Sequence, residues 1–111
     1  MGLGIDIIEI SRFIPFKKSR KDLFLLDNYS PAELDYCFSF QDPAPHLAGI
    51  FAAKEAVVKC WVKEKITLSA VEIKKEPSGR PVVWINHRRQ KLILVSISHS
   101  NKIALAIAIK Q

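Results

Sequence analysis

The amino-acid sequence predicts an α+β domain in which a small antiparallel sheet packs against one long central helix and several shorter helices. The first observation is a stretch of helical length and helical period, residues 47–63, that contains no proline. The second is a set of short segments rich in β-branched residues, of which two pairs are joined by tight-turn sequences. Because tight turns connect antiparallel neighbours, these pairs predict hairpins.

The length of the chain indicates one domain, residues 1–111. Its composition gives an excess of positive charge. The chain has 17 Lys and Arg against 11 Asp and Glu, a formal net charge of +6. A chain of this size buries a modest core, yet 49% of its residues are hydrophobic. Part of that surplus is therefore expected in a subunit interface. The charge favours an anionic partner, which could be a nucleic acid, a phosphorylated ligand, an anionic membrane or an acidic protein.

The two cysteines and the apolar segments indicate the cellular compartment in which the protein is expected. Cys37 and Cys60 have no metal-ligand spacing and are expected to be reduced thiols, as in a cytosolic protein. The N-terminal apolar run lacks a charged leader and is interrupted by acids, so no signal peptide is expected. No stretch reaches the length of a membrane-spanning helix.

Residues 2–10 are expected to form the first strand, and they carry an acid in an isoleucine-rich run. Alternation puts Leu3, Ile5 and Ile7 on one face and Asp6 on the other. A carboxylate in such a run must be paired, hydrogen-bonded or bound to a cation. A structural hydrogen bond is the alternative to a binding role for Asp6.

Residues 12–21 form the most basic segment of the chain and contain no acid. The interleaved apolar residues predict an amphipathic basic helix that can continue to Leu26. A solvated charged face is the usual meaning of such a run, but five positive charges without a negative one favour an anionic partner surface. The basic residues are Arg12, Lys17, Lys18, Arg20 and Lys21.

Two helices are expected in the middle of the chain. Ser30-Pro31-Ala32-Glu33 combines an N-cap serine, a proline at the first position and a glutamate three residues after the cap, which is typical of a helix start. Residues 41–46 separate this helix from the central one. In the central helix, Lys54 lies near the middle of the apolar face, where its charge needs a partner or must reach solvent.

The opposite side of the central helix carries a narrow stripe: Ala48, Ala52, Glu55 and Lys59. The two alanines would let a ligand or another backbone approach closely. Glu55 and Lys59 are one turn apart and would project side by side. A solvated ion pair between them is the alternative to a functional role.

The C-terminal half predicts two strand pairs. In the last strand, alanines alternate with Ile and Leu, and such an alanine face invites close packing by a helix or by a neighbouring subunit. Residues 87–91 are a polar basic link between the pairs. The strands are expected at residues 66–75 and 80–85, joined by a turn at 77–79, and at 92–99 and 103–109, joined by a turn at 100–102.

Asp6, Glu55 and His99 stand out against apolar surroundings as candidates for chemistry. Two carboxylates suit Mg²⁺, which keeps waters and takes one or two carboxylates together with substrate phosphate oxygens. Lys59 would then meet the phosphate beside the metal. A hydrolase triad of Asp6, His99 and either Ser96 or Ser98 is an alternative, but the G-x-S-x-G motif is missing.

Several motifs, in the right order, resemble those of the holo-acyl-carrier-protein synthases, and together they cover nearly the whole chain. They are Gly4–Ile10 with Arg12, the helix start Ser30–Glu33, the central Phe51–Lys59, Gly79-Arg80-Pro81, and Ser96–His99. The resemblance implies a phosphopantetheinyl transferase fold. It also implies transfer of the 4′-phosphopantetheine group of coenzyme A to a serine of apo-acyl carrier protein, with release of adenosine 3′,5′-bisphosphate.

The same resemblance assigns roles to residues. It implies Mg²⁺ held by Asp6 and Glu55, with Glu55 and Lys59 as the catalytic residues. Coenzyme A would contact Lys59, Arg80, Pro81, Ser98 and His99. The acidic carrier protein would dock on Arg12, Lys17, Arg20 and Lys21.

The family is typically trimeric, which implies a homotrimer with active sites between subunits and places the alanine face and the apolar surplus at the interface. The resemblance also implies a cytoplasmic enzyme that has no nucleic-acid or membrane partner. Residues 41–46, Ile50 and residues 62–65 differ from the basic cluster, the arginine and the glycine-rich loop that many members carry. A non-catalytic homologue and a basic nucleic-acid-binding module remain the alternatives.

Overall fold

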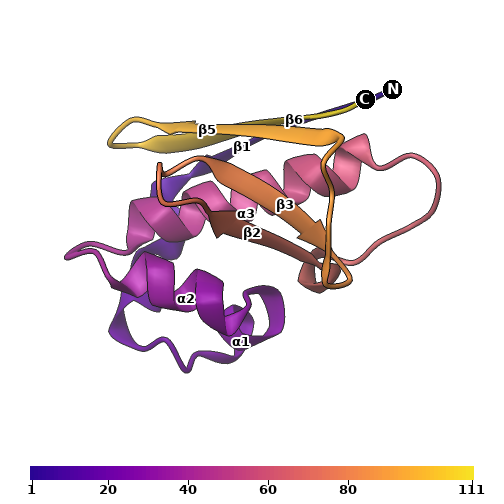
Figure 1. Cartoon of the computed structure of the whole chain (residues 1–111). Helices are drawn as coiled ribbons and strands as arrows, with labels where there is room; N and C mark the ends of the chain where they lie inside the picture. The colour runs from indigo at the N-terminus through magenta and orange to yellow at the C-terminus, as the bar shows by residue number, and fades with distance from the viewer.

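The structure is a computed structural model that describes all residues, 1–111. Its centre is helix α3 (Ala44–Cys60). A three-stranded antiparallel sheet of order β1-β6-β5 covers one side of this helix, and a second sheet of order β2-β3-β4 and the short helices α1 and α2 lie on its other sides (Figure 1). The α+β class is therefore confirmed, with two small sheets in place of the single sheet that was expected. No helix is both long enough and apolar enough to cross a membrane.

The first sheet joins the two ends of the chain. Strand β1 (Gly2–Glu9) pairs along its whole length with β6 (Ile103–Lys110), and β6 pairs with β5 (Ile93–His99). The alanine face of β6 is buried against α3, since Ala104, Ala106 and Ala108 are at most 1% exposed. The expectation that this face belongs to the subunit interface was wrong. Small side chains there let the sheet approach the helix closely.

The opposite face of this sheet is apolar and exposed. Leu3, Ile5 and Ile7 of β1 are 55–64% exposed, and their neighbours on β6 and β5 remain 37–42% exposed. These neighbours are Ile103, Leu105, Ile107 and Leu94. We call these seven residues the outer apolar face. Contiguous apolar surface of this kind marks an interaction site.

The second sheet differs from the sequence expectation at its edges. Strand β2 (Val71–Lys75) begins later than expected, because residues 68–70 form a short 3-10 turn, η2 (Leu68–Ala70). Strand β3 (Pro81–Ile85) follows the expected turn. The basic link contains a two-residue strand, β4 (Arg88–Arg89). Asn86 and His87 have φ of 49° and 65°, and this left-handed pair closes a tight β3–β4 hairpin.

The basic N-terminal segment is not one continuous α-helix, and this expectation was wrong. It folds as a 3-10 helix, η1 (Ile10–Lys18), a turn at Arg20 and Lys21, and helix α1 (Leu23–Asn28). Pro15 lies inside η1 and cannot donate a backbone hydrogen bond. Asp22 starts α1, because its carboxylate accepts a hydrogen bond from the Phe24 backbone N–H at 2.8 Å.

The helix start at Ser30 is confirmed. Helix α2 (Pro31–Phe38) begins with a capping box in which the Ser30 hydroxyl accepts from the Glu33 backbone N–H and Glu33 accepts from the Ser30 backbone N–H. Helix α3 begins three residues earlier than expected, at Ala44, and ends at Cys60 instead of residue 63. The Asp42 carboxylate accepts from the Ala44 N–H at 3.2 Å, which helps to explain the early start.

Candidate active site

Asp6 and Lys59 meet between β1 and α3. The Lys59 Nζ atom donates to the Asp6 carboxylate at 3.2 Å and to the Ile5 carbonyl at 3.0 Å. The Asp6 side chain is 18% exposed and the Lys59 side chain 51% exposed, so the pair opens to solvent on the lysine side. The acid in the isoleucine-rich strand therefore has the partner that the sequence required.

Two glycines set the spacing between β1 and α3. A Cβ atom at Gly2 would overlap the Cys60 carbonyl, and one at Gly4 would overlap the Ala56 carbonyl. The strand backbone therefore lies directly on the helix and runs opposite to it. Two residues further along β1, this register brings Asp6 toward Ala52, one turn before Ala56. A strand backbone thus lies against the helix at Ala56 and Cys60, just C-terminal to the alanines of the stripe.

Glu55 is the acid of α3 next to Lys59, and we call Asp6, Glu55 and Lys59 the polar corner. It is half-buried and lies one helical turn before Lys59 on the same side of α3. It has no ion-pair partner in the structure, so the solvated Glu55–Lys59 pair, which was the alternative to a functional role, does not form, and Lys59 pairs with Asp6 instead.

The donor set of this corner fits Mg²⁺. Two carboxylates and the Ile5 carbonyl are hard oxygen donors, and the carboxylate–carbonyl pair already holds one cation, the Lys59 ammonium group. No three His, Cys, Asp or Glu residues gather closely enough to hold a metal alone. The corner therefore suits an ion that also takes waters and phosphate oxygens, and Asp6 and Glu55 are the residues that would hold it.

A cleft of about 160 Å³ lies at the end of β5 and is lined by cationic and titratable side chains. His99 of β5, His46 of α3 and Lys75 of β2 line it, and no acid does. The His46 ring stacks on Phe40 with centroids 3.5 Å apart and meets the His99 ring edge-on at 5.9 Å. A cleft lined by these groups favours an anion.

Burial lowers the pKa values of two groups that line this cleft. Desolvation lowers the pKa of His46, and the neighbouring His99 and Lys75 lower it further. Desolvation also lowers the pKa of Lys75. Both pKa shifts arise because the site is partly dry, and at His46 the neighbouring positive charges add to the effect. An incoming anion would favour the charged form of each group.

Arg80, Pro81 and Ser98 lie apart from the Asp6 corner within one chain. Arg80 and Pro81 line a groove of about 240 Å³ between β3 and β5, together with Arg89 and Lys91. Pro81 pairs with Lys75 in the β2–β3 register, so this groove adjoins the cleft. Ser98 pairs with Leu105 on the outer apolar face, whereas the adjacent His99 lines the cleft. The structure thus places Ser98 and His99 on opposite faces of β5.

Two of the four expected docking residues already have acidic partners. Lys17 pairs with Asp42 at 3.1 Å, and Arg20 pairs with Asp35 at 2.6 Å. Arg12 and Lys21 are exposed and form no ion pair. The unpaired cations are the ones that carry full charge toward a partner.

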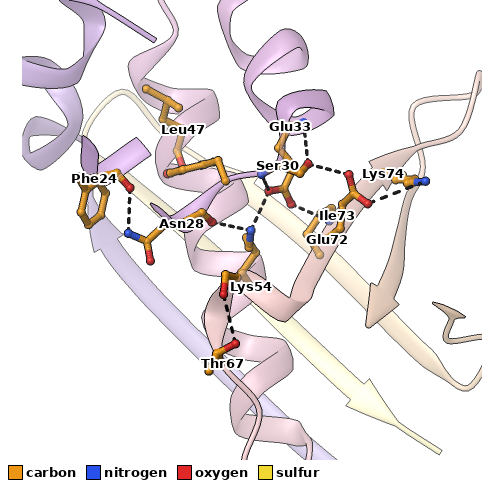
Figure 2. Close-up of polar contacts among 12 residues, drawn as sticks. Phe24, Asn28, Ser30, Glu33, Leu47, Lys54, Thr67, Glu72, Ile73 and Lys74 are labelled. Atoms are coloured by element: carbon orange, nitrogen blue, oxygen red, sulfur yellow. Dashed lines mark hydrogen bonds and ion pairs between the residues drawn. The ribbon is translucent and has the colours of Figure 1, made fainter. Parts of the chain in front are cut away.

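A buried polar network anchors α3 next to the corner (Figure 2). Lys54 donates to the Glu33 carboxylate at 2.7 Å and to the Asn28 carbonyl at 2.6 Å. The other Glu33 oxygen accepts from the Ile73 backbone N–H at 2.7 Å. One pair of side chains thus connects α2, α3 and β2 at the residue adjacent to Glu55.

Sequence reasoning did not identify His46, Lys75 or the Glu33–Lys54 pairing. His46 stands in the stretch that differs from the resembled family, and Lys75 lies in an ordinary strand end. Neither has a spacing that signals a site, because the cleft joins α2, α3, β2 and β5. The position of Lys54 on the apolar face was the signal, because its charge needed a partner or a route to solvent, and the structure supplies Glu33 as the partner.

Comparisons with known proteins agree with this architecture. The model of the 4′-phosphopantetheinyl transferase superfamily matches residues 2–108. A holo-[acyl-carrier-protein] synthase from Thermodesulfovibrio yellowstonii is 37% identical over 109 residues, covering 97% of this chain and 96% of the relative. A synthase of the same name from Protochlamydia amoebophila is 39% identical over 117 residues, covering 98% and 96%.

Solved structures show the same fold. The Helicobacter pylori holo-[acyl-carrier-protein] synthase in complex with coenzyme A has a TM-score of 0.78 at 27% identity, covering 98% of this chain and 99% of that one. The Neisseria meningitidis synthase has a TM-score of 0.79 at 25% identity, covering 99% and 97%. With a family match over nearly the whole chain and relatives of about its own length, the chain belongs to the 4′-phosphopantetheinyl transferase superfamily.

Proposed function

We propose that the protein is a holo-acyl-carrier-protein synthase that transfers the 4′-phosphopantetheine group of coenzyme A to a serine of an apo-acyl carrier protein. Adenosine 3′,5′-bisphosphate is the second product. The observation that carries the proposal is the Asp6–Lys59 pair beside Glu55, in which the Asp6 carboxylate and the Ile5 carbonyl already accept from the Lys59 ammonium group, in a chain of this family. Such a corner can hold a pyrophosphate through a metal ion and an ammonium group.

Within this proposal, Asp6 and Glu55 would hold Mg²⁺, which would supply charge neutralisation at the pyrophosphate. Lys59 donates to the phosphoryl oxygens and stabilises their charge as the serine oxygen attacks phosphorus and the bisphosphate leaves. Glu55 or a solvent water takes the serine proton. His99, Arg80 and Pro81 contact the nucleotide part of coenzyme A.

The proposal includes a homotrimer. The outer apolar face is continuous over all three strands of the first sheet and has no partner within the chain. A second copy of the chain is its proposed occupant, which would bury the apolar surplus. Ser98 lies on this face and would then contribute from one subunit to a site shared with the next.

Arg12 and Lys21, supported by Lys17 and Arg20, form the proposed docking surface for the acidic carrier protein. Charge complementarity speeds association and selects partners. Cys37 and Cys60 are buried and unpaired, as is usual in a reducing compartment, and the proposal places the enzyme in the cytoplasm.

The test is to incubate the protein with coenzyme A, Mg²⁺ and several apo-carrier proteins and to follow the carrier mass. We expect a gain of one phosphopantetheine per carrier that depends on the carrier serine and on Mg²⁺. Carrier binding without a mass gain would indicate a non-catalytic homologue. DNA binding without carrier binding or a mass gain would favour the nucleic-acid module.

A further inference from the structure

The hydrogen bonds of Lys59 have a consequence for how the corner accepts a metal ion. The Lys59 ammonium group lies 3.2 Å from the Asp6 carboxylate oxygen and 3.0 Å from the Ile5 carbonyl oxygen. Oxygen donors of these two kinds also coordinate Mg²⁺. One cation of the chain itself therefore lies where a divalent ion would bind.

We infer that Lys59 is a resident cation at Asp6 which a divalent ion displaces, and that this exchange couples ion binding to nucleotide binding. The inference rests on the proposed function, because it takes Asp6 as a metal ligand. It adds that Lys59 opposes the ion when the nucleotide is absent and assists it when the nucleotide is present.

Placing Mg²⁺ and the Lys59 ammonium group on the same Asp6 carboxylate is energetically unfavourable. Mg²⁺ coordinates oxygen at about 2.0–2.1 Å, and an ammonium group on the same carboxylate would lie within a few ångströms of it. At that separation like charges repel strongly in a site of low effective dielectric. The side chain of Asp6 is only 18% exposed, so solvent screens the repulsion incompletely. Binding of the ion therefore requires Lys59 to move.

Lys59 is free to make that move. Its side chain is 51% exposed and emerges near the end of α3, so no packing holds the ammonium group at Asp6. The ammonium group is a compact charge on a flexible stem with three rotatable donors. A pyrophosphate that enters with the ion offers it new anionic oxygens. In the absence of the nucleotide, the displaced group gains only water.

The experiment measures the affinity of Mn²⁺, a spectroscopic substitute for Mg²⁺, by titration without coenzyme A and again with saturating coenzyme A. No carrier protein is present, so no turnover occurs. We compare the wild-type protein with Lys59→Met and Lys59→Gln. Lys63→Met is the matched control, because it removes one exposed positive charge just beyond the same helix end and breaks no ion pair.

We expect Lys59→Met to bind Mn²⁺ alone roughly two- to fivefold more tightly than wild type, the range that corresponds to a partly exposed ion pair. Coenzyme A should then enhance ion binding less in this variant than in wild type, because the displaced ammonium group no longer contributes. By reciprocity, the ion should enhance coenzyme A binding less as well. Lys63→Met should resemble wild type in both titrations.

The outcomes separate this inference from the proposed function. If Lys59→Met and Lys59→Gln bind Mn²⁺ alone no more tightly than wild type, while Asp6→Asn weakens the binding, the metal site stands and the resident cation is disproved. If Asp6→Asn leaves Mn²⁺ affinity unchanged with and without coenzyme A, the metal site itself fails and the inference with it. Circular dichroism checks that each variant is folded.

Discussion

Lys54 Nζ lies 2.7 Å from Glu33 Oε1, and neither side chain is more than 1% exposed. The charged ends of the two side chains also form hydrogen bonds with the backbone of Asn28 at the end of α1, Ser30 before α2 and Ile73 on β2. The pair therefore connects three parts of the chain at the residue that precedes Glu55.

Breaking the buried pair should destabilise the fold. Lys54→Met leaves the Glu33 carboxylate buried without its counter-charge, and we expect the free energy of unfolding to fall by about 3–5 kcal/mol. Urea unfolding at fixed protein concentration measures this. The double variant Glu33→Gln/Lys54→Met should recover part of the loss. Lys65→Met, at an exposed position without an ion pair, should change stability by less than about 0.5 kcal/mol. An equal effect of the Lys54 and Lys65 variants would contradict the role of the pair.

Removing either proposed metal ligand should abolish transfer while leaving the fold intact. Because each carboxylate would share the charge of the ion, Asp6→Asn and Glu55→Gln should each lower kcat by at least about 100-fold. Glu64→Gln, an exposed acid beyond α3, is the control and should remain active. Turnover is followed by carrier mass, and the fold by thermal melting. Near-wild-type activity of both variants at limiting Mg²⁺ would show that these residues are not the ligands.

A charge on the outer apolar face should break the trimer. Leu105 lies on the central strand of the first sheet and is 38% exposed within one chain. Leu105→Glu would bury a charge in the proposed interface, and light scattering at micromolar concentration should then show monomers. Leu23→Glu, at a 76% exposed apolar residue on α1, should remain trimeric. A monomeric wild-type protein would refute the assembly.

The four docking residues should differ in how much each contributes to KM for the carrier. Arg12→Gln and Lys21→Gln remove unpaired charges and should raise KM for the carrier roughly two- to fivefold. Lys17→Gln and Arg20→Gln should have smaller effects, because Asp42 and Asp35 already neutralise these cations. None should change KM for coenzyme A appreciably. Equal effects on both substrates would place the docking surface elsewhere.

Salt provides a second measure of the same surface. The Debye length falls from about 30 Å at 0.01 M to about 8 Å at physiological ionic strength. KM for the carrier should therefore rise with salt more steeply for wild type than for Arg12→Gln. Parallel salt dependences for the two proteins would contradict the assignment of Arg12.

The cleft should bind anions more tightly as pH falls. Burial, His99 and Lys75 hold the pKa of His46 below its ordinary value, so His46 gains its proton only below about pH 6.5. A bound phosphate would favour the protonated ring. Calorimetric affinity for coenzyme A should therefore rise between pH 7.5 and 5.5 more in wild type than in His46→Gln. Identical pH profiles would exclude His46 from the site.

Stability without a ligand should show the opposite sign. Because the pKa of His46 is lowered on folding, the unfolded chain binds more protons just below pH 6.5. Its contribution is thus present above that pH and is lost as the pH falls toward the folded-state value. His46→Gln should remove this part of the acid sensitivity in urea unfolding.

Several features follow from local sequence alone. The capping box at Ser30 and Glu33 and the alternation along β1 and β6 are short-range patterns, and each appears where it was predicted. Asp6 and Lys54 were identified as charges needing partners, because an unpaired charge in an apolar element is costly whatever the fold. The family motifs added the identity of the enzyme class, which the family match confirms.

Tertiary structure decided what local patterns left open. The alanine face of β6 could have met a helix or a subunit, and only the close approach of α3 determined that the isoleucine and leucine face is the exposed one. Likewise, the partner of Lys59 is Asp6 across the strand, although Glu55 was the neighbour by spacing. The cleft of His46, Lys75 and His99 joins residues that are distant in sequence. The physical reason is that sequence spacing fixes neighbours within one element, whereas packing between elements selects which of their faces and charges meet.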